Sequence, residues 1–236
     1  MSFLKDLYMI KNERLLNVFN LANKKFYSDL ANKRSKSLHW EQYDTRVYNI
    51  KTLLNFRKKE GLSLGLDDSS MIDSKLYAQF YNLLTEEFIL NNMGKKNIGN
   101  SPFHVFYKQH YVDPNKLVHL IWYKILSESI SPKKLPKNVC EIGGGFGSFA
   151  EVIIRNLDSK ILLIDLPEAN LMSAYYLKEN FPEKKLYLFD DYQINEFLSF
   201  DDYNKNDIII LPPNCNIDKA IKFDLFVNSR SMMEMN

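Results

Sequence analysis

A segment of seven residues in the second half of the chain contains an acid and four glycines in an order that could bind a nucleoside. Residues 141–147 read Glu-Ile-Gly-Gly-Gly-Phe-Gly, directly after a short apolar run and before a helical pattern. A second apolar run, 161–164, leads to Asp165, eighteen residues after Gly147. The glycines let the backbone pass close to a ligand, and the acid can accept hydrogen bonds from ribose hydroxyls. The spacing predicts a nucleotide-binding strand–turn–helix–strand unit.

The order of the glycines distinguishes two classes of ligand. A dinucleotide fingerprint, Gly-x-Gly-x-x-Gly, that started at Gly143 would need a glycine at its sixth position, where this chain has Ser148. The pattern Glu-x-Gly-x-Gly-x-Gly is complete and begins at Glu141. A carboxylate there would repel a pyrophosphate and attract a cation. An NAD-dependent oxidoreductase is therefore the less favoured interpretation.

The complete pattern resembles the first motif of the class I S-adenosylmethionine (SAM)-dependent methyltransferases. SAM carries an ammonium and a sulfonium and has no phosphate, which suits Glu141. Further segments resemble one group more closely, the sugar O-methyltransferases associated with bacterial surface-polysaccharide gene clusters. These segments are 99–103, 164–168 with 174–177, 210–213 and 223–235. The resemblance covers about residues 98–236.

The resemblance implies a cofactor, SAM, and an acceptor, the hydroxyl of a sugar or glycan in polysaccharide biosynthesis. The cofactor-binding residues would be Glu141, Gly143, Gly144, Gly145, Phe146, Gly147, Asp165, Leu166, Asn214 and Asn228. The glycine turn would line the methionine part, Asp165 would hold the ribose, and Leu166 would lie beside the adenine. An acid or amide after the third strand would also contact adenine. Asp190, Asp191 and Asn214 are the candidates, because either 185–189 or 207–211 could be that strand.

Methyl transfer to a hydroxyl also needs a group that removes a proton. Glu234 is one candidate base, because its segment leaves the last expected strand toward the carboxyl ends of the sheet. His104 and His110 lie upstream and are its rivals. The ordinary interpretations are a solvent-facing acid for Glu234 and surface or packed side chains for the histidines. The sequence predicts no metal site.

Bulk properties narrow the choice of partners. The chain has 236 residues, 45% of them hydrophobic, and a formal net charge of +2, so neither nucleic acid nor a membrane surface is expected as a partner. The N-terminus lacks the apolar region of a signal peptide, and no apolar run is long enough to span a bilayer. We therefore expect a cytoplasmic protein without a membrane span.

The elements that must position these residues follow from hydrophobic periodicity. Strands are expected at 138–142, 160–165, 185–189, 207–211 and 223–228, with helices at 148–156 and 167–180 between them. Upstream, helices are expected at 3–32, at 71–92 with Gly94 as a C-terminal glycine, and from Asp113-Pro114 to Ser129. A loop is expected at 61–70, and a turn followed by an extended or hairpin-like segment at 97–112. This order predicts an α/β fold: a Rossmann-like parallel sheet preceded by a mostly helical N-terminal region. A proline-rich connector, 131–137, would divide a helical region, 1–130, from a SAM-binding domain, 138–236.

The C-terminal end of the chain bears on activity. A class I methyltransferase sheet normally continues past its fourth strand with a helix and three more strands, whereas this chain ends eight residues after Asn228. The expected core is therefore incomplete, as in a C-terminally truncated enzyme. Two consequences follow as hypotheses: a catalytically inactive SAM-binding or interaction module, and self-association through an uncovered strand at 223–228.

Overall fold

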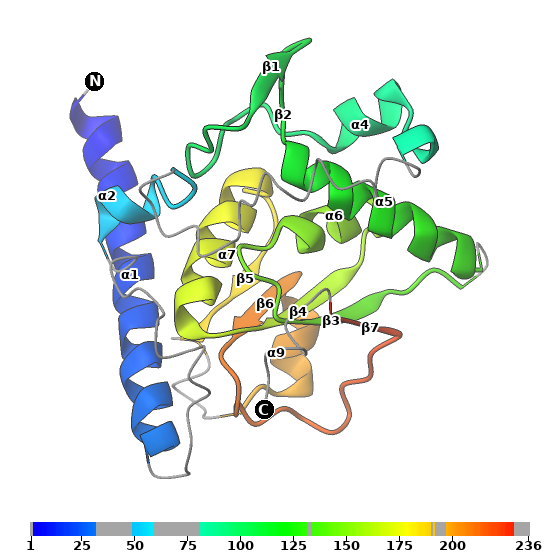
Figure 1. Cartoon of the computed structure of the whole chain (residues 1–236). Coiled ribbons are helices and arrows are strands. Elements are labelled where there is room, and N and C mark those ends of the chain that lie inside the picture. Colours follow the sequence, from blue (N-terminus) through cyan, green and yellow to red (C-terminus); the bar gives the residue numbers. More distant parts are fainter. Residues whose placement is uncertain are drawn as a thin grey trace.

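A five-stranded parallel sheet forms the centre of the computed structural model, which describes residues 2–31, 49–58, 81–131, 134–189, 191 and 197–228. The strands are β3 (Asn138–Ile142), β4 (Lys160–Ile164), β5 (Leu186–Tyr187), β6 (Ile208–Leu211) and β7 (Leu225–Val227). They lie in the order β5-β6-β4-β3-β7, and every pairing is parallel (Figure 1). The predicted α/β fold with a parallel sheet is confirmed at this level.

Helices cover both faces of the sheet. Helices α6 (Ser148–Leu157) and α7 (Pro167–Asn180) lie on one side, and α9 (Phe200–Lys205) lies on the other (Figure 1). All four residues of β6 and the middle residues of β3 and β4 are buried. Burial on both faces explains why these strands appear in the sequence as short continuous apolar runs instead of alternating patterns.

The strand order answers which apolar run adjoins β4. Residues 208–211 form β6, which pairs with β4 along its length, from Ile161 opposite Ile208 to Ile164 opposite Leu211. The earlier run forms only the two-residue strand β5, which pairs with β6 at the outer edge of the sheet. Both runs are strands, and the later one lies beside β4.

The last strand, β7, lies at the opposite edge. It pairs with β3, and the carboxylate of Asp224 accepts hydrogen bonds of 2.9 Å from the amides of Lys137 and Asn138 at the start of β3. The position at a sheet edge agrees with the sequence-based prediction. Phe226 on this strand is 65% exposed, so apolar surface is uncovered at this edge.

The long N-terminal helix was predicted correctly, and it has a packing role that the sequence did not indicate. Helix α1 (Ser2–Ala31) lies along α7 (Figure 1) and buries Leu15, Phe19 and Ala22. With the sheet below it and α1 beside it, α7 is buried around its whole circumference from Pro167 to Leu177. The apolar core is therefore continuous between the N-terminal helix and the sheet. The division of the chain at 131–137 stays a prediction.

The segment before β3 follows the sequence pattern closely. A hairpin pairs β1 (Val105–Tyr107) with β2 (His110–Val112), as predicted. Helix α5 (Pro114–Ser129) starts after Asp113, whose carboxylate accepts a hydrogen bond of 3.0 Å from the amide of Asn115. The expected N-cap and the expected first-turn proline are both confirmed.

The predicted helix at 71–92 is confirmed at 86–92, but it is not continuous over the described residues that begin at 81. Residues 81–83 form a short 3-10 helix, η4 (Tyr81–Leu83), and a separate helix, α4 (Glu86–Asn92), begins after Thr85. The Thr85 hydroxyl accepts a hydrogen bond of 3.2 Å from the Phe88 amide and so starts a new helix. Residues 71–80 and the predicted loop 61–70 lie outside the described residues.

Gly94 does not act as a C-terminal glycine. The C-cap of α4 is Met93 in an extended conformation, and Gly94 does not have the positive φ that such a role requires. The carbonyl of Gly94 instead accepts a hydrogen bond of 2.9 Å from the amide of Tyr111 in the hairpin. A further short helix, α2 (Ile50–Leu53), follows its N-cap Asn49. None of the described helices is long and apolar enough to cross a bilayer.

Candidate functional site

The glycine turn joins β3 to α6, as predicted. Gly143, Gly145 and Gly147 have φ values of 73°, 57° and 86°, in the left-handed region that side chains disfavour. Gly144 is required for a different reason: a Cβ there would overlap Cδ2 of Leu163 and lie 3.2 Å from the carboxyl carbon of Glu141. The turn is therefore a bare stretch of backbone pressed against β4 at the carboxyl end of the sheet.

Asp165 holds the turn from the neighbouring strand. Its carboxylate accepts one hydrogen bond of 2.8 Å from the amide of Gly145 and another of 2.7 Å from the amide of Leu166. The sequence placed this acid at the end of a strand beside the turn, and the structure brings the two together. Their joint position is the strongest agreement between the sequence and the site.

Glu141 has the most unusual environment at the turn. Its side chain points into the protein from β3, and the residue is only 1% exposed. Neither carboxyl oxygen has a hydrogen-bond partner among the described residues. Burial, together with the nearby Asp165 carboxylate, raises its pKa from an ordinary value of 4.5 to about 8. An acid that is buried, unbonded and next to a second acid fits a position that a cationic ligand would complete.

The other predicted binding residues gather at the same edge of the sheet. Asn228 follows β7, and its side-chain amide donates a hydrogen bond of 2.8 Å to the carbonyl of Ile142, directly before the turn. Leu166 is buried after Asp165. Asn214 is exposed in the loop after β6, with a φ of 68°. The carboxyl ends of parallel strands are where ligands bind in open α/β sheets.

Phe146 belongs to the turn only through its backbone. Its ring is buried in the helical layer, with centroids 5.6 Å from Phe56 and 5.1 Å from Tyr176. The predicted role of its side chain in ligand binding therefore gives way to packing. Asp191, a rival to Asn214, follows β5 at the outer edge, where it accepts a hydrogen bond of 2.9 Å from the amide of Leu188. Asp190 lies outside the described residues.

The three predicted bases have different positions. His104 has a side chain only 5% exposed, and its Nε2 lies 3.1 Å from a carboxylate oxygen of Asp113. His110 lies on the hairpin, where its Nδ1 is 2.7 Å from the carbonyl of Lys108. It lines a cavity of about 360 Å³ with Arg155, near the C-terminal end of α6, so it is not brought to the turn that precedes that helix. Glu234 lies outside the described residues.

An arginine that sequence reasoning missed links His104 to the glycine turn. Arg57 is 1% exposed, and its Nη1 lies 2.7 Å from Oδ2 of Asp113 and 3.1 Å from Nε2 of His104. Its guanidinium carbon lies 4.7 Å from the ring centroid of Phe146. Burial opposes ionisation of Asp113, but the Arg57 charge and the His104 contact outweigh it and hold the pKa of that carboxyl well below its usual range. A lone arginine beside two lysines gave no signal in the sequence.

Two further contacts between helices were also not predicted. Lys116 on α5 and Tyr176 on α7 both bind the buried carboxylate of Glu151 on α6, which accepts another hydrogen bond of 2.8 Å from Arg155. Nδ1 of His119 on α5 lies 2.9 Å from the hydroxyl of Ser148, the first residue of α6. Polar bonds therefore fix all three helices around the start of α6.

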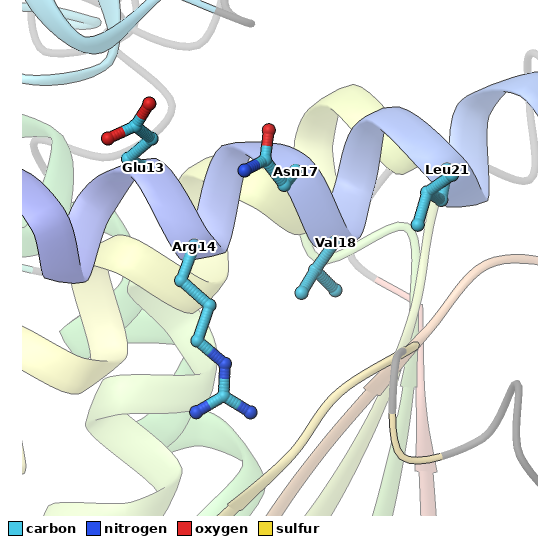
Figure 2. Close-up of a pocket in the computed structure, with 5 residues that line it drawn as sticks. All are labelled: Glu13, Arg14, Asn17, Val18 and Leu21. Atoms are coloured by element: carbon cyan, nitrogen blue, oxygen red, sulfur yellow. The ribbon is translucent and has the colours of Figure 1, made fainter.

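One further cavity lies along α1 and has little chemistry. Its volume is about 340 Å³, and its lining comes from α1 alone: Glu13, Arg14, Asn17, Val18 and Leu21 (Figure 2). Figure 2 shows Glu13 directed away from Arg14 and Val18, so these side chains do not converge on one point. Over the ranges that the structure describes, no group of three or more His, Cys, Asp or Glu residues could hold a metal ion.

Comparisons with known proteins add no relative. No protein-family model, no curated protein and no solved structure matches this chain. Arguments about function therefore rest on the turn, its acids and the resemblance of individual motifs.

Proposed function

We propose that this chain is a SAM-dependent O-methyltransferase that acts on the hydroxyl of a sugar or glycan. The observation that carries the proposal is the pair of acids at the glycine turn: Glu141, buried without a bonding partner, and Asp165, bound to the backbone of the turn. Among the described residues, the turn has two carboxyls beside it and no phosphate-binding cation, which suits a positively charged nucleoside better than a dinucleotide.

The sheet supports this position for the ligand. The chain moves from β3 to β4 on one side, and later returns to place β7 on the other side of β3. Such a reversal of strand order opens a crevice at the carboxyl ends of the strands, where ligands of open α/β sheets bind. The glycine turn and Asn228 lie at this reversal, and we infer that the sheet is part of a class I methyltransferase core.

Residues at the site could contact three parts of SAM: its ammonium group, its ribose and its adenine. Glu141 would hold the ammonium, Asp165 would accept hydrogen bonds from the ribose hydroxyls, and Leu166 with Asn214 would lie beside the adenine. When bound, SAM supplies a methyl group on a positively charged sulfur, which a hydroxyl oxygen can attack. The protein contributes by holding the acceptor oxygen in line and by accepting its proton.

His104 is the base that we propose. Nε2 of His104 lies 3.1 Å from a carboxylate oxygen of Asp113 and 3.1 Å from Nη1 of Arg57, and we propose the tautomer whose Nε2 proton faces the carboxylate. Nδ1 is then the basic nitrogen, and it has no hydrogen-bond partner in the described part of the chain. Arg57 fixes Asp113 and touches Phe146, which keeps this pair beside the turn.

Substitution of Asp165 tests the cofactor site. We expect the parent protein to bind SAM and S-adenosylhomocysteine but not NAD, and Asp165→Ala to weaken SAM binding about 10- to 100-fold, because a charge-assisted hydrogen bond contributes roughly 1.5–3 kcal/mol. Isothermal titration calorimetry measures both. Asp191→Ala is the matched change, since it also removes a carboxylate that accepts a backbone hydrogen bond, but at the outer edge of the sheet. Equal losses in both variants, or tighter binding of NAD, would contradict the proposal.

Substitution of His104 tests the transfer step and separates an enzyme from an inactive SAM-binding module. Labelled methyl transfer from SAM to nucleotide sugars and to surface polysaccharide would be measured. His104→Gln is expected to lower transfer about 10²- to 10⁴-fold, the usual contribution of a general base, with SAM affinity unchanged. His110→Gln, on the exposed hairpin, should leave transfer unchanged. Transfer by neither the parent nor any variant would favour the inactive module.

Location and assembly belong to the same proposal. A role in polysaccharide biosynthesis rests on the resemblance, and a place in the cytoplasm stays an expectation from the sequence. Self-association through β7 is supported by its edge position and by the exposure of Phe226, whose ring lies 5.4 Å from that of Phe223. Sedimentation at several protein concentrations tests it, and a monomer at every concentration would remove this part of the proposal.

A further inference from the structure

The position of Glu141 bears on the charge of the ligand. In the register of the sheet, Glu141 lies opposite Leu163 of β4, and its carboxyl carbon lies 3.2 Å from the point where a Cβ on Gly144 would be. The carboxyl group is therefore directly beneath the backbone of the turn. Both of its oxygens lack hydrogen-bond donors among the residues described, although the side chain is almost fully buried.

Within the described part of the chain, no cation neutralises Glu141. Directly after β4, Asp165 is held by two amides and adds a negative charge; on β3, the neighbour is the thiol of Cys140. The nearby helices carry the titratable groups Lys116, His119, Glu151, Arg155 and Glu168. Lys116 and Arg155 both bind Glu151, and Arg57, which lies against the ring of Phe146, binds Asp113. A buried carboxylate in this setting is strongly disfavoured, and the neutral acid is the stable form of the free site.

We infer that Glu141 selects a ligand that bears an ammonium group, and that binding of this group drives a proton from Glu141 into solvent. This inference rests on the proposed function. The protonated acid and the free ammonium become a carboxylate–ammonium pair plus one released proton, so charge and atoms balance. An ammonium has three N–H donors for the two unbonded oxygens, whereas a sulfonium has none. The preference is therefore for the amino-acid end of SAM.

The direction of the pH effect follows from the same environment. With a pKa of about 8, Glu141 is protonated in the free protein near neutral pH. Binding that requires its ionised form becomes about tenfold tighter for each unit of rising pH below that value. An α-amino group has a pKa of roughly 7.7–8.0, so the ammonium of the ligand persists below pH 7. The informative range is therefore pH 5.5–7.

Calorimetry in two buffers measures the released proton. At pH 6.5, titrations of SAM in phosphate and in imidazole should give enthalpies that differ by about one buffer protonation. S-adenosylhomocysteine keeps the ammonium and should give the same result. 5′-Methylthioadenosine has the nucleoside and the sulfur but no amino acid, and it should release no proton.

Glu141→Gln is the matched variant, because it keeps the shape of the protonated acid but cannot ionise. The parent should bind SAM about tenfold more tightly at pH 6.5 than at pH 5.5, whereas the affinity of the variant should change less than about threefold. His104 and His119 are present in both proteins, so they do not explain a difference between the parent and the variant. If the variant does not fold, the proton release measured on the parent protein with SAM and with 5′-methylthioadenosine still tests the role of Glu141.

The failures are distinguishable. SAM binding without proton release, or an unchanged pH dependence in Glu141→Gln, would overturn the role of Glu141 and leave the cofactor site standing. Binding of neither SAM nor S-adenosylhomocysteine by the parent would overturn the proposed function, and this inference with it.

Discussion

Asp113→Ala is expected to lower the free energy of unfolding by about 3–5 kcal/mol, the usual cost of removing one partner from a buried ion pair. The substitution leaves the guanidinium of Arg57 in the core without its carboxylate, at a position where the two groups are 2.7 Å apart. It also removes the N-cap of α5. Urea denaturation monitored by circular dichroism measures the change. Because the folded-state pKa of Asp113 is depressed, its contribution is present above pH 3.8 and is lost as pH falls through the lower folded-state value.

Thr85→Ala provides the control for the capping part of this effect. Thr85 caps α4 through one hydrogen bond and has no buried ion pair. Its loss should cost only about 1 kcal/mol. If Asp113→Ala cost no more than Thr85→Ala, the contact between Arg57 and Asp113 would contribute little, and the support that we assign to His104 would fail.

Glu141→Gln should act in the opposite direction and stabilise the free protein near neutral pH. The folded-state pKa of Glu141 is raised from 4.5 to about 8, so the unfolded chain ionises this group first. The contribution of the neutral acid is complete below pH 4.5 and is lost as pH rises toward 8. Between pH 4.5 and 7 the parent should lose about 3 kcal/mol through this group, and the glutamine variant should not.

The measurement compares unfolding free energies of parent and variant at pH 4.5 and pH 7. Glu183→Gln is the matched control, because it makes the same chemical change on an exposed turn after α7. Its difference from the parent should be small at both pH values. The difference in unfolding free energy between the Glu141→Gln variant and the parent should be larger at pH 7 than at pH 4.5. An equal difference at both pH values would show that the pKa of Glu141 is not raised by the fold. The calorimetry measures what Glu141 contributes to ligand binding, and the unfolding measurements give its effect on the stability of the free protein.

The sequence by itself determined the local parts of the fold. Interactions within a few residues set the strands β3, β4 and β6, the start of α5 at Asp113-Pro114 and the hairpin at 105–112, and each is visible in residue order. The glycine turn with Asp165 could be predicted for the same reason, because adjacent strands of one βαβ unit bring these residues together. The break between η4 and α4 is also local, but the capping by Thr85 was not recognised within a longer apolar pattern.

Only the tertiary structure decided which distant elements meet. No local feature of residues 207–211 indicates that this strand lies between β5 and β4, because parallel pairing joins segments that are far apart in the chain. The cover that α1 gives α7, and the contact of Arg57 with Asp113 and His104, likewise join remote segments. The isolation of Glu141 is of the same kind. Its type was visible in the sequence, but a pKa depends on burial and on the charges that the complete fold brings near, and these exist only after the chain has packed.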